Sequence, residues 1–107
     1  MLGEFEYLLL TAAVRLGEEA YGATIRQEIG THTGHLCSIG ALYTTIDRLE
    51  KKGLIKTWMS EGIRERGGRA KRMIRVTSAG VKAATEFYNA VIGVSCGVSW
   101  AQCELAG

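Results

Sequence analysis

Apolar residues recur every three or four positions through the first half of the chain, the spacing of a helix with one buried face. In residues 3–16 this pattern begins at Phe5, and Gly17 follows as a residue that ends helices. Residues 21–30 repeat the pattern more weakly, with two isoleucines four positions apart. We therefore predict helices over these two segments.

A third and stronger helical pattern begins at Ser38 and ends at Gly53. A serine suits the N-cap position, and a glycine suits the position just after the last turn. The large apolar residues between them share one stripe, which we expect to face the core. They are Ile39, Leu42, Ile46 and Leu49.

The hydrophobic period changes after this third helix. Residues 54–60 and 72–77 are short and rich in residues that favour strands, and a charged, glycine-containing segment separates them. This pattern is typical of a β-hairpin with a long tip. Thr77 suits the N-cap of a final helix, which we expect to run to about residue 101.

The predicted order of elements is three helices, two strands and a helix. We therefore predict a mainly α fold with a small β-hairpin, a winged helix-turn-helix over residues 1–77. An added C-terminal helix over 78–101 completes the domain. A chain of 107 residues that is 47% hydrophobic fits one such domain.

The outer face of the third helix carries small and hydroxyl side chains in its first turns and basic ones in its last turns. Small residues allow close approach to a DNA groove, hydroxyls can bond base edges or phosphates, and cations favour the backbone. For this stretch taken alone, an ordinary amphipathic helix with a tolerant surface is the more common explanation.

Charge distribution strengthens the nucleic-acid hypothesis. The net charge is only +2, but residues 64–75 hold six cationic side chains against one carboxylate. Basic residues along a glycine-containing loop suit phosphate contacts. The alternative for this loop alone is a solvated charged surface. The cations are Arg64, Arg66, Arg69, Lys71, Arg72 and Arg75.

The final helix is apolar on almost every side from Ala90 to Trp100. A terminal helix of a small domain cannot bury every side against its own chain, so we expect a second copy to cover the surplus. The expected partner is therefore a second copy of the chain, and the expected assembly is a homodimer. Its predicted interface residues are Phe87, Val91, Val94, Val98 and Trp100.

Other function classes lack support in the sequence. His32, His35 and Cys37 lie in one loop but have no paired metal-ligand spacing, so we expect no metal, no cofactor and no enzyme activity. The three cysteines are odd in number and no secretion signal precedes the first helix, which favours reduced thiols in the cytoplasm. No apolar run is long enough to span a membrane. The roles of Cys96 and Cys103 stay open.

Four sequence segments, taken in order, resemble the PadR-like transcriptional regulators. They are LGEFEYLLL at 2–10, AYG at 20–22, GALYTTIDRLEKKGLI at 40–55 and RGGRAKR at 66–72. The resemblance implies a dimeric winged-helix repressor of the compact kind, with the third helix in the major groove and the hairpin on the DNA backbone. Met73 and Ile74 depart from the family, which usually has an aromatic residue after its basic pair.

Carried over by position, the resemblance predicts contacts with double-stranded DNA. The residues carried over are Ser38, Gly40, Ala41, Tyr43, Thr44 and Thr45 of the third helix and Arg69, Lys71 and Arg72 of the hairpin. The basic end of the helix face adds Arg48, and the charge pattern of the loop adds Arg64 and Arg66. Some members bind flat aromatic compounds between subunits, so Trp100 is the candidate for an effector contact. The alternative function is a winged-helix module that binds a protein instead of DNA.

Overall fold

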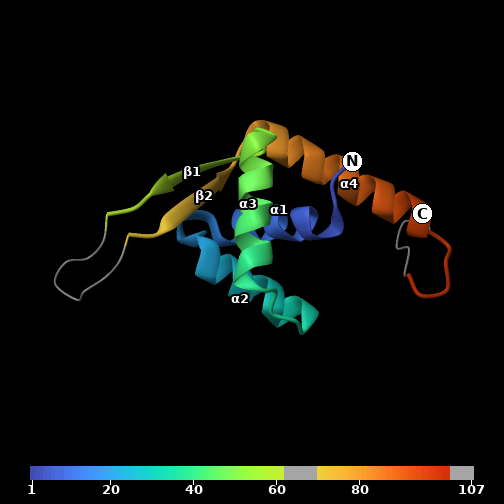
Figure 1. The fold of residues 1–107 in the computed structure, drawn as a ribbon. Helices are drawn as coiled ribbons and strands as arrows, with labels where there is room; N and C mark the ends of the chain where they lie inside the picture. Colours follow the sequence, from blue (N-terminus) through green and yellow to red (C-terminus); the bar gives the residue numbers. More distant parts are fainter. Residues whose placement is uncertain (62–69, 102–107) are drawn as a thin grey trace.

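The computed structural model describes residues 1–61 and 70–101, and its elements follow the predicted order (Figure 1). The two strands form one antiparallel hairpin. The predicted winged helix-turn-helix with a C-terminal helix is therefore confirmed. The elements are α1 (Glu4–Leu16), the 3₁₀ turn η1 (Gly17–Glu19), α2 (Gly22–Thr33), α3 (Ile39–Lys51), β1 (Ile55–Met59), β2 (Arg72–Val76) and α4 (Ser78–Ser95).

The core lies where α1, α2 and α3 meet the base of the hairpin. α3 crosses α1 and α2, and the hairpin extends away from this crossing (Figure 1). Burying large aliphatic side chains at the crossing supplies most of the driving force for folding. The largest fully buried side chains are Leu9, Leu10, Ile25, Leu42, Ile46, Leu49 and Ile55.

The hairpin base is attached to the link between α1 and α2. Its register pairs Ile55 with Val76 and Trp58 with Met73. On the other edge of β2, Tyr21 forms an antiparallel bridge with Met73. β2 is therefore paired along both of its edges, which fixes the hairpin against this link.

The helix ends use the predicted capping residues. The hydroxyl of Ser38 accepts a hydrogen bond of 3.0 Å from the backbone N–H of Ala41, and the hydroxyl of Thr77 accepts one of 3.1 Å from Gly80. Gly53 follows α3 with a φ of +74°, a conformation that suits glycine. The local signals at these ends were sufficient because caps depend on neighbouring backbone only.

Two predictions from hydrophobic spacing are wrong. Ile39 is 61% exposed, because the first turn of α3 projects past the core that buries the rest of the stripe. α4 ends at Ser95, and Gly97 with a φ of +86° turns the chain. Val98 and Trp100 therefore lie beyond the helix that was expected to hold them.

α4 leaves the body of the domain after its first turns and extends away from it (Figure 1). Gly80 is its one fully buried residue. Over the described ranges, no helix is both long and apolar enough to cross a membrane. Cys96, just after α4, is disulfide-bonded in the structure, whereas the sequence favoured reduced thiols.

Candidate nucleic-acid interface

The first half of α3 presents an exposed face of small side chains. Ser38, Gly40, Ala41 and Thr44 are all exposed, and no atom of another residue would obstruct a Cβ built on Gly40. Small side chains let a second molecule approach the helix backbone closely. This face therefore has the shape that a helix in the DNA major groove requires.

Tyr43 links this face to the start of α2. Its hydroxyl lies so close to Gly22 that a Cβ on this residue would overlap it. Gly22 is the first residue of α2, where unpaired backbone N–H groups and the helix dipole favour an anion. The tyrosine hydroxyl and the positive end of α2 therefore lie together at the edge of the candidate interface.

Thr45 lies on the buried side of α3, apart from the other predicted contact residues of this helix. Its side chain is 6% exposed, and its hydroxyl donates a 2.8 Å hydrogen bond to the carbonyl of Ala41. One residue along a helix turns the side chain by about 100°. Thr44 and Thr45 consequently lie on different sides of α3.

Two exposed apolar residues were missed as site candidates. Leu36, in the turn before α3, and Ile39, in its first turn, line an open groove of about 430 Å³ between α2 and α3. Arg26 in the same groove donates a 2.6 Å hydrogen bond to the carbonyl of Cys37 and so holds the turn in place. The only signal in the sequence was the position of Ile39 at the very start of its helix, where the core ends.

On the hairpin, Lys71 is exposed and lies over the ring of Tyr21. Its Nζ is 4.3 Å from the ring centroid and donates a 3.2 Å hydrogen bond to the tyrosine hydroxyl. An exposed ammonium held in this way keeps donors available for a phosphate. Lys71 therefore has N–H donors available for contact with a phosphate of the DNA backbone.

Arg72, another predicted contact residue of the hairpin, has ion-pair partners within the domain. Its guanidinium lies 2.9 Å from a carboxylate oxygen of Asp47 and 3.0 Å from one of Glu50, both on α3. The side chain is 24% exposed. Its charge is therefore paired with two carboxylates of α3.

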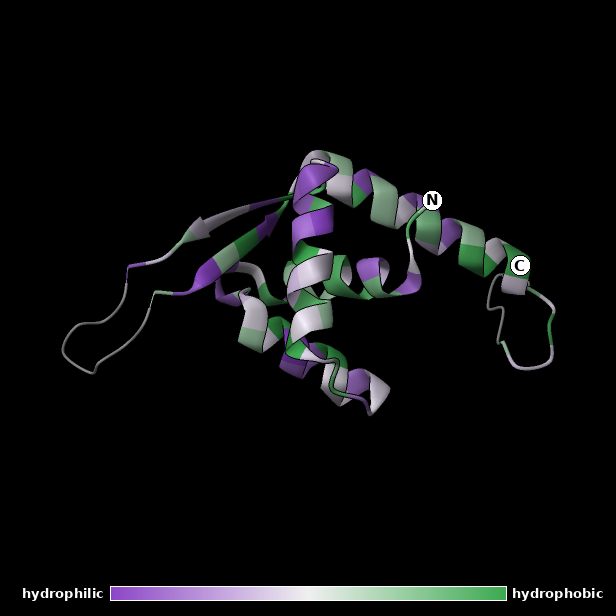
Figure 2. Ribbon diagram, in the orientation of Figure 1, coloured by the Kyte–Doolittle hydropathy of each residue, from purple (hydrophilic) through white to green (hydrophobic). Residues whose placement is uncertain are grey.

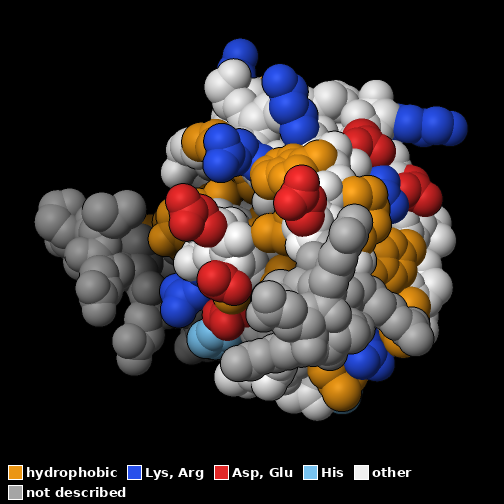
Figure 3. All heavy atoms as spheres, turned by 90° about the vertical axis from the view of Figure 1, so that its left-hand side faces the viewer, with side chains coloured by type: hydrophobic (Ala, Val, Ile, Leu, Met, Phe, Trp, Pro, Cys, Tyr) orange, Lys and Arg blue, Asp and Glu red, His pale blue; other side chains and the backbone are white. Residues whose placement is uncertain are grey.

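Of the remaining predicted cationic contacts, one lies among the described residues and three do not. Arg48 is exposed on α3, in the half nearer to Lys51. Arg64, Arg66 and Arg69 lie outside the described residues. Seen from the hairpin side, the described side chains mix cationic, anionic and hydrophobic groups (Figure 3).

α4 carries the predicted self-association surface. Hydrophobic residues recur along the helix as far as its C-terminal end (Figure 2). Val94 is 83% exposed and Val91 is also exposed, whereas the ring of Phe87 packs 4.9 Å from that of Tyr7 in the same chain. Phe87 is therefore partly used inside the domain. Beyond the helix, Val98 is half-buried and Trp100 is 84% exposed.

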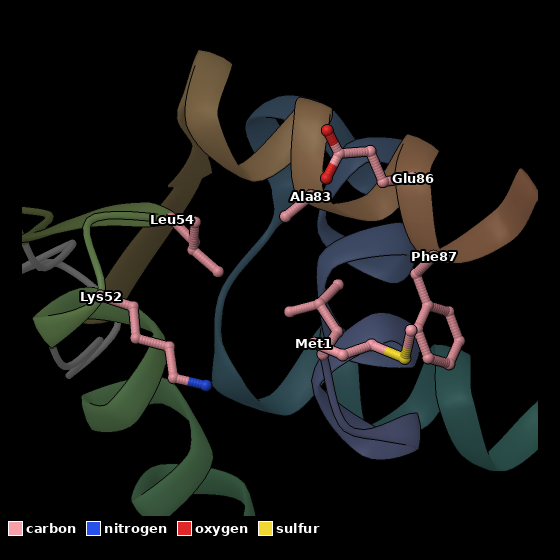
Figure 4. Close-up of a pocket in the computed structure, with 7 residues that line it drawn as sticks. Met1, Lys52, Leu54, Ala83, Glu86 and Phe87 are labelled. Atoms are coloured by element: carbon pink, nitrogen blue, oxygen red, sulfur yellow. The ribbon is translucent and has the colours of Figure 1, made fainter. Parts of the chain in front are cut away.

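An open hollow of about 540 Å³ lies between the base of α4, the N-terminus and the end of α3 (Figure 4). Lys52 and Phe87 are among the residues that line it. The hollow is at the opposite end of α3 from Ser38, about 20 Å away by the helix rise. It does not form part of the candidate nucleic-acid interface.

Beside this hollow, a buried carboxylate joins α1 to Lys52, the residue that follows α3. Glu6 accepts hydrogen bonds of 2.8 Å from the backbone N–H of Gly3 and 2.8 Å from Nζ of Lys52. Burial by itself would raise the pKa of Glu6, but these two hydrogen bonds and the nearby cations outweigh it, so the pKa lies below its ordinary value. Glu6 is therefore a structural anion.

Among residues 1–61 and 70–101, no three His, Cys, Asp or Glu side chains lie close enough together to hold a metal ion. His32 and Glu28 are instead paired at 2.9 Å on α2.

Comparison with known proteins agrees with this geometry. The chain is 40% identical over 103 residues to the transcriptional regulator Rv3488 of Mycobacterium tuberculosis, with 90% of this chain and 92% of the relative covered. A PadR-like transcriptional regulator from Bacillus cereus has a similar fold, with a TM-score of 0.70, 22% identity, and 85% and 84% of the two chains covered. A transcriptional regulator from Clostridium thermocellum gives a TM-score of 0.70 at 24% identity, with 84% of each chain covered.

The model of the transcriptional regulator PadR-like family matches residues 9–86, which span α1 to the middle of α4. This range contains the helix-turn-helix, the hairpin and the first half of the projecting helix. The chain therefore belongs to the PadR-like family of transcriptional regulators.

Proposed function

We propose that the protein is a homodimeric, cytoplasmic transcriptional repressor that binds double-stranded DNA. In this proposal α3 lies in the major groove and the hairpin follows the backbone. The observation that carries it is the exposed small-residue face of α3, standing beside a hairpin that presents Lys71. Membership of a family of transcriptional regulators supports the same function.

The proposal divides the contacts by chemistry. Ser38, Gly40, Ala41 and Thr44 would approach base edges, because they are exposed and lie at the start of α3. A second group, of hydroxyl and cationic side chains, would contact phosphates and supply most of the affinity. This group is Tyr43, Arg48 and Lys71 together with Arg64, Arg66 and Arg69 of the hairpin segment.

A second subunit is part of the proposal for two reasons. One short helix reads few base pairs, so two copies on a near-palindromic site give adequate selectivity. The exposed apolar side chains of α4 would pair with those of a second copy across a two-fold axis. The two half-sites would then lie roughly one turn of DNA apart.

An effector contact is a further part of this proposal. Trp100 is exposed beyond the end of α4, where its indole face is accessible to a flat aromatic compound. If it binds one, the compound should quench the tryptophan fluorescence of wild-type protein. Replacement by Trp100→Phe should abolish that quenching, since Trp58 on β1 remains as the internal control.

Selection of bound duplexes from random DNA tests the central proposal. We expect an enriched near-palindrome whose half-site spacing matches one helical turn. Binding should weaken steeply with salt, as it does when cations contact phosphates. Failure to enrich any sequence, together with salt-independent retention, would favour the alternative of a winged-helix module that binds a protein.

A further inference from the structure

The hairpin is fastened to α3 by a compact network of charged and hydroxyl groups. Arg72, the first residue of β2, places Nη1 2.9 Å from Oδ1 of Asp47 and Nη2 3.0 Å from Oε1 of Glu50. The other carboxylate oxygen of Glu50 accepts a hydrogen bond from the hydroxyl of Thr57 on β1. Both strands of the hairpin are thus tied to the same part of α3.

The geometry of this network suits a rigid connection between the hairpin and α3. Asp47 and Glu50 are three residues apart, so they share one side of the helix. The planar guanidinium of Arg72 presents its donors as a rigid fork and can engage both carboxylates together. Networks of this kind define an orientation more sharply than a single exposed ion pair, which contributes little.

From this network we infer that Arg72, Asp47 and Glu50 are positioning residues for DNA binding. They set the angle of the hairpin against α3, so that Lys71 meets the DNA backbone when α3 lies in the groove. The inference rests on the proposed DNA-binding function. In this inference Asp47 and Glu50 assist DNA binding, although their negative charges lie on the surface proposed to face the phosphates.

This assignment and simple electrostatics predict opposite signs. Two carboxylates near phosphates repel them, so removing both should tighten binding if charge alone matters. If the carboxylates position the hairpin, removing them should weaken binding. The sign of one measured change therefore separates the two explanations.

The first experiment replaces both carboxylates, Asp47→Ala with Glu50→Ala, because alanine is the best helix former. Affinity for the selected duplex is measured by fluorescence anisotropy at several salt concentrations. We expect binding about three- to tenfold weaker than wild type, with an unchanged salt slope. The control is Glu61→Ala, which removes an exposed carboxylate after β1 and should bind as tightly as wild type or tighter.

The second experiment uses Arg72→Ala. Its control is Lys56→Ala, which removes an exposed cation of β1 that lies outside the predicted DNA contacts. We expect Arg72→Ala to weaken binding by a factor similar to that of the carboxylate pair. Combining all three substitutions should cause little further loss, because they break one network. The salt slope should stay that of wild type, since no phosphate contact is removed.

The opposite result would overturn the inference. If Arg72 contacts a phosphate directly, Arg72→Ala lowers the magnitude of the salt slope by about one, and the carboxylate variant binds as tightly as wild type or tighter. Wild-type protein that binds no duplex at all would instead remove the proposed function, and this inference with it. The two failures are therefore distinguishable.

Hydrogen exchange of the free protein provides a readout that does not depend on DNA. We expect faster amide exchange in β1 and β2 of the carboxylate variant, with unchanged exchange in the core of α1. Unchanged exchange in both strands would contradict the inference that this network holds the hairpin on α3. If the double variant does not fold, Glu50→Gln with Asp47 retained should change affinity and exchange in the same direction by a smaller amount, because the pair between Arg72 and Asp47 remains.

Discussion

At the residue scale, adjacent side chains of α3 have opposite environments. Thr44 is exposed, whereas Thr45 is buried and bonds the carbonyl of Ala41 with its hydroxyl. Both were predicted to face DNA because the sequence has two equivalent threonines at the edge of the apolar stripe. Only the packing of α3 against the core decides which of them is covered.

This difference gives a matched pair of variants. Thr44→Ala should change the preferred bases of the selected site and leave stability nearly unchanged, because the side chain is exposed. Thr45→Ala should lower the free energy of unfolding by about 1 kcal/mol and leave the preferred site unchanged. Selection from random DNA and denaturant unfolding of both variants check this. An altered site for Thr45→Ala alone would contradict the assignment.

Glu6 gives a prediction about acid stability. Its folded-state pKa lies below the ordinary value of 4.5, so its ionised form stabilises the fold above that pH. This stabilisation is lost as the pH falls through the lowered pKa. Glu6→Gln should therefore lower the free energy of unfolding by about 1–2 kcal/mol at pH 7 and narrow the difference from wild type near pH 3. Parallel stability curves from pH 7 to pH 3 would contradict this role.

At the element scale, α3, the hairpin and α4 meet at one short turn. The hydroxyl of Thr77 donates a 2.7 Å hydrogen bond to the carbonyl of Gly53, and its N–H donates a 3.0 Å bond to that of Leu54. A Cβ on Gly80 would overlap the carbonyl oxygen of Leu54. Gly80 is therefore the residue that lets α4 pack closely on this turn.

Gly80→Ala should destabilise the protein in spite of the better helix propensity of alanine. The overlap is with backbone, which cannot move aside cheaply, so we expect a loss of about 1–3 kcal/mol. Gly93→Ala is the control in the same helix, since no atom lies within 4 Å of its Cβ position. Thermal unfolding should show Gly93→Ala at least as stable as wild type. Equal effects of the two substitutions would argue against close packing at Gly80.

At the scale of the whole molecule, the hairpin and α4 both project from the core and make the domain elongated. The domain measures 55 × 28 × 25 Å, with the hairpin and α4 pointing in different directions (Figure 1). Elements that project from a small domain bury little surface of their own. We therefore expect each to gain its contacts from a partner, the hairpin from DNA and α4 from a second subunit.

Charges placed on the exposed face of α4 test this arrangement. Val91→Glu with Val94→Glu should yield a monomer, because an apolar interface does not accommodate unpaired carboxylates. Sedimentation measures the assembly, and anisotropy measures DNA affinity, which should fall by at least tenfold with the loss of one half-site. Lys82→Glu changes charge near the start of the same helix and serves as control. A dimer of unchanged affinity would exclude this face as the interface.

The order of elements, the capped N-terminal ends of α3 and α4, and the family resemblance could all be predicted from the residue pattern. These features depend on local backbone preferences and on hydrophobic period, which are written in contiguous residues. Three features could not be predicted from the residue pattern and follow from tertiary contacts. Thr45 is buried, Ile39 is exposed, and Arg72 is paired with carboxylates of α3. The reason is physical: burial and ion pairing depend on where distant segments meet, and a side chain at the edge of a helical stripe is covered only if another element reaches it.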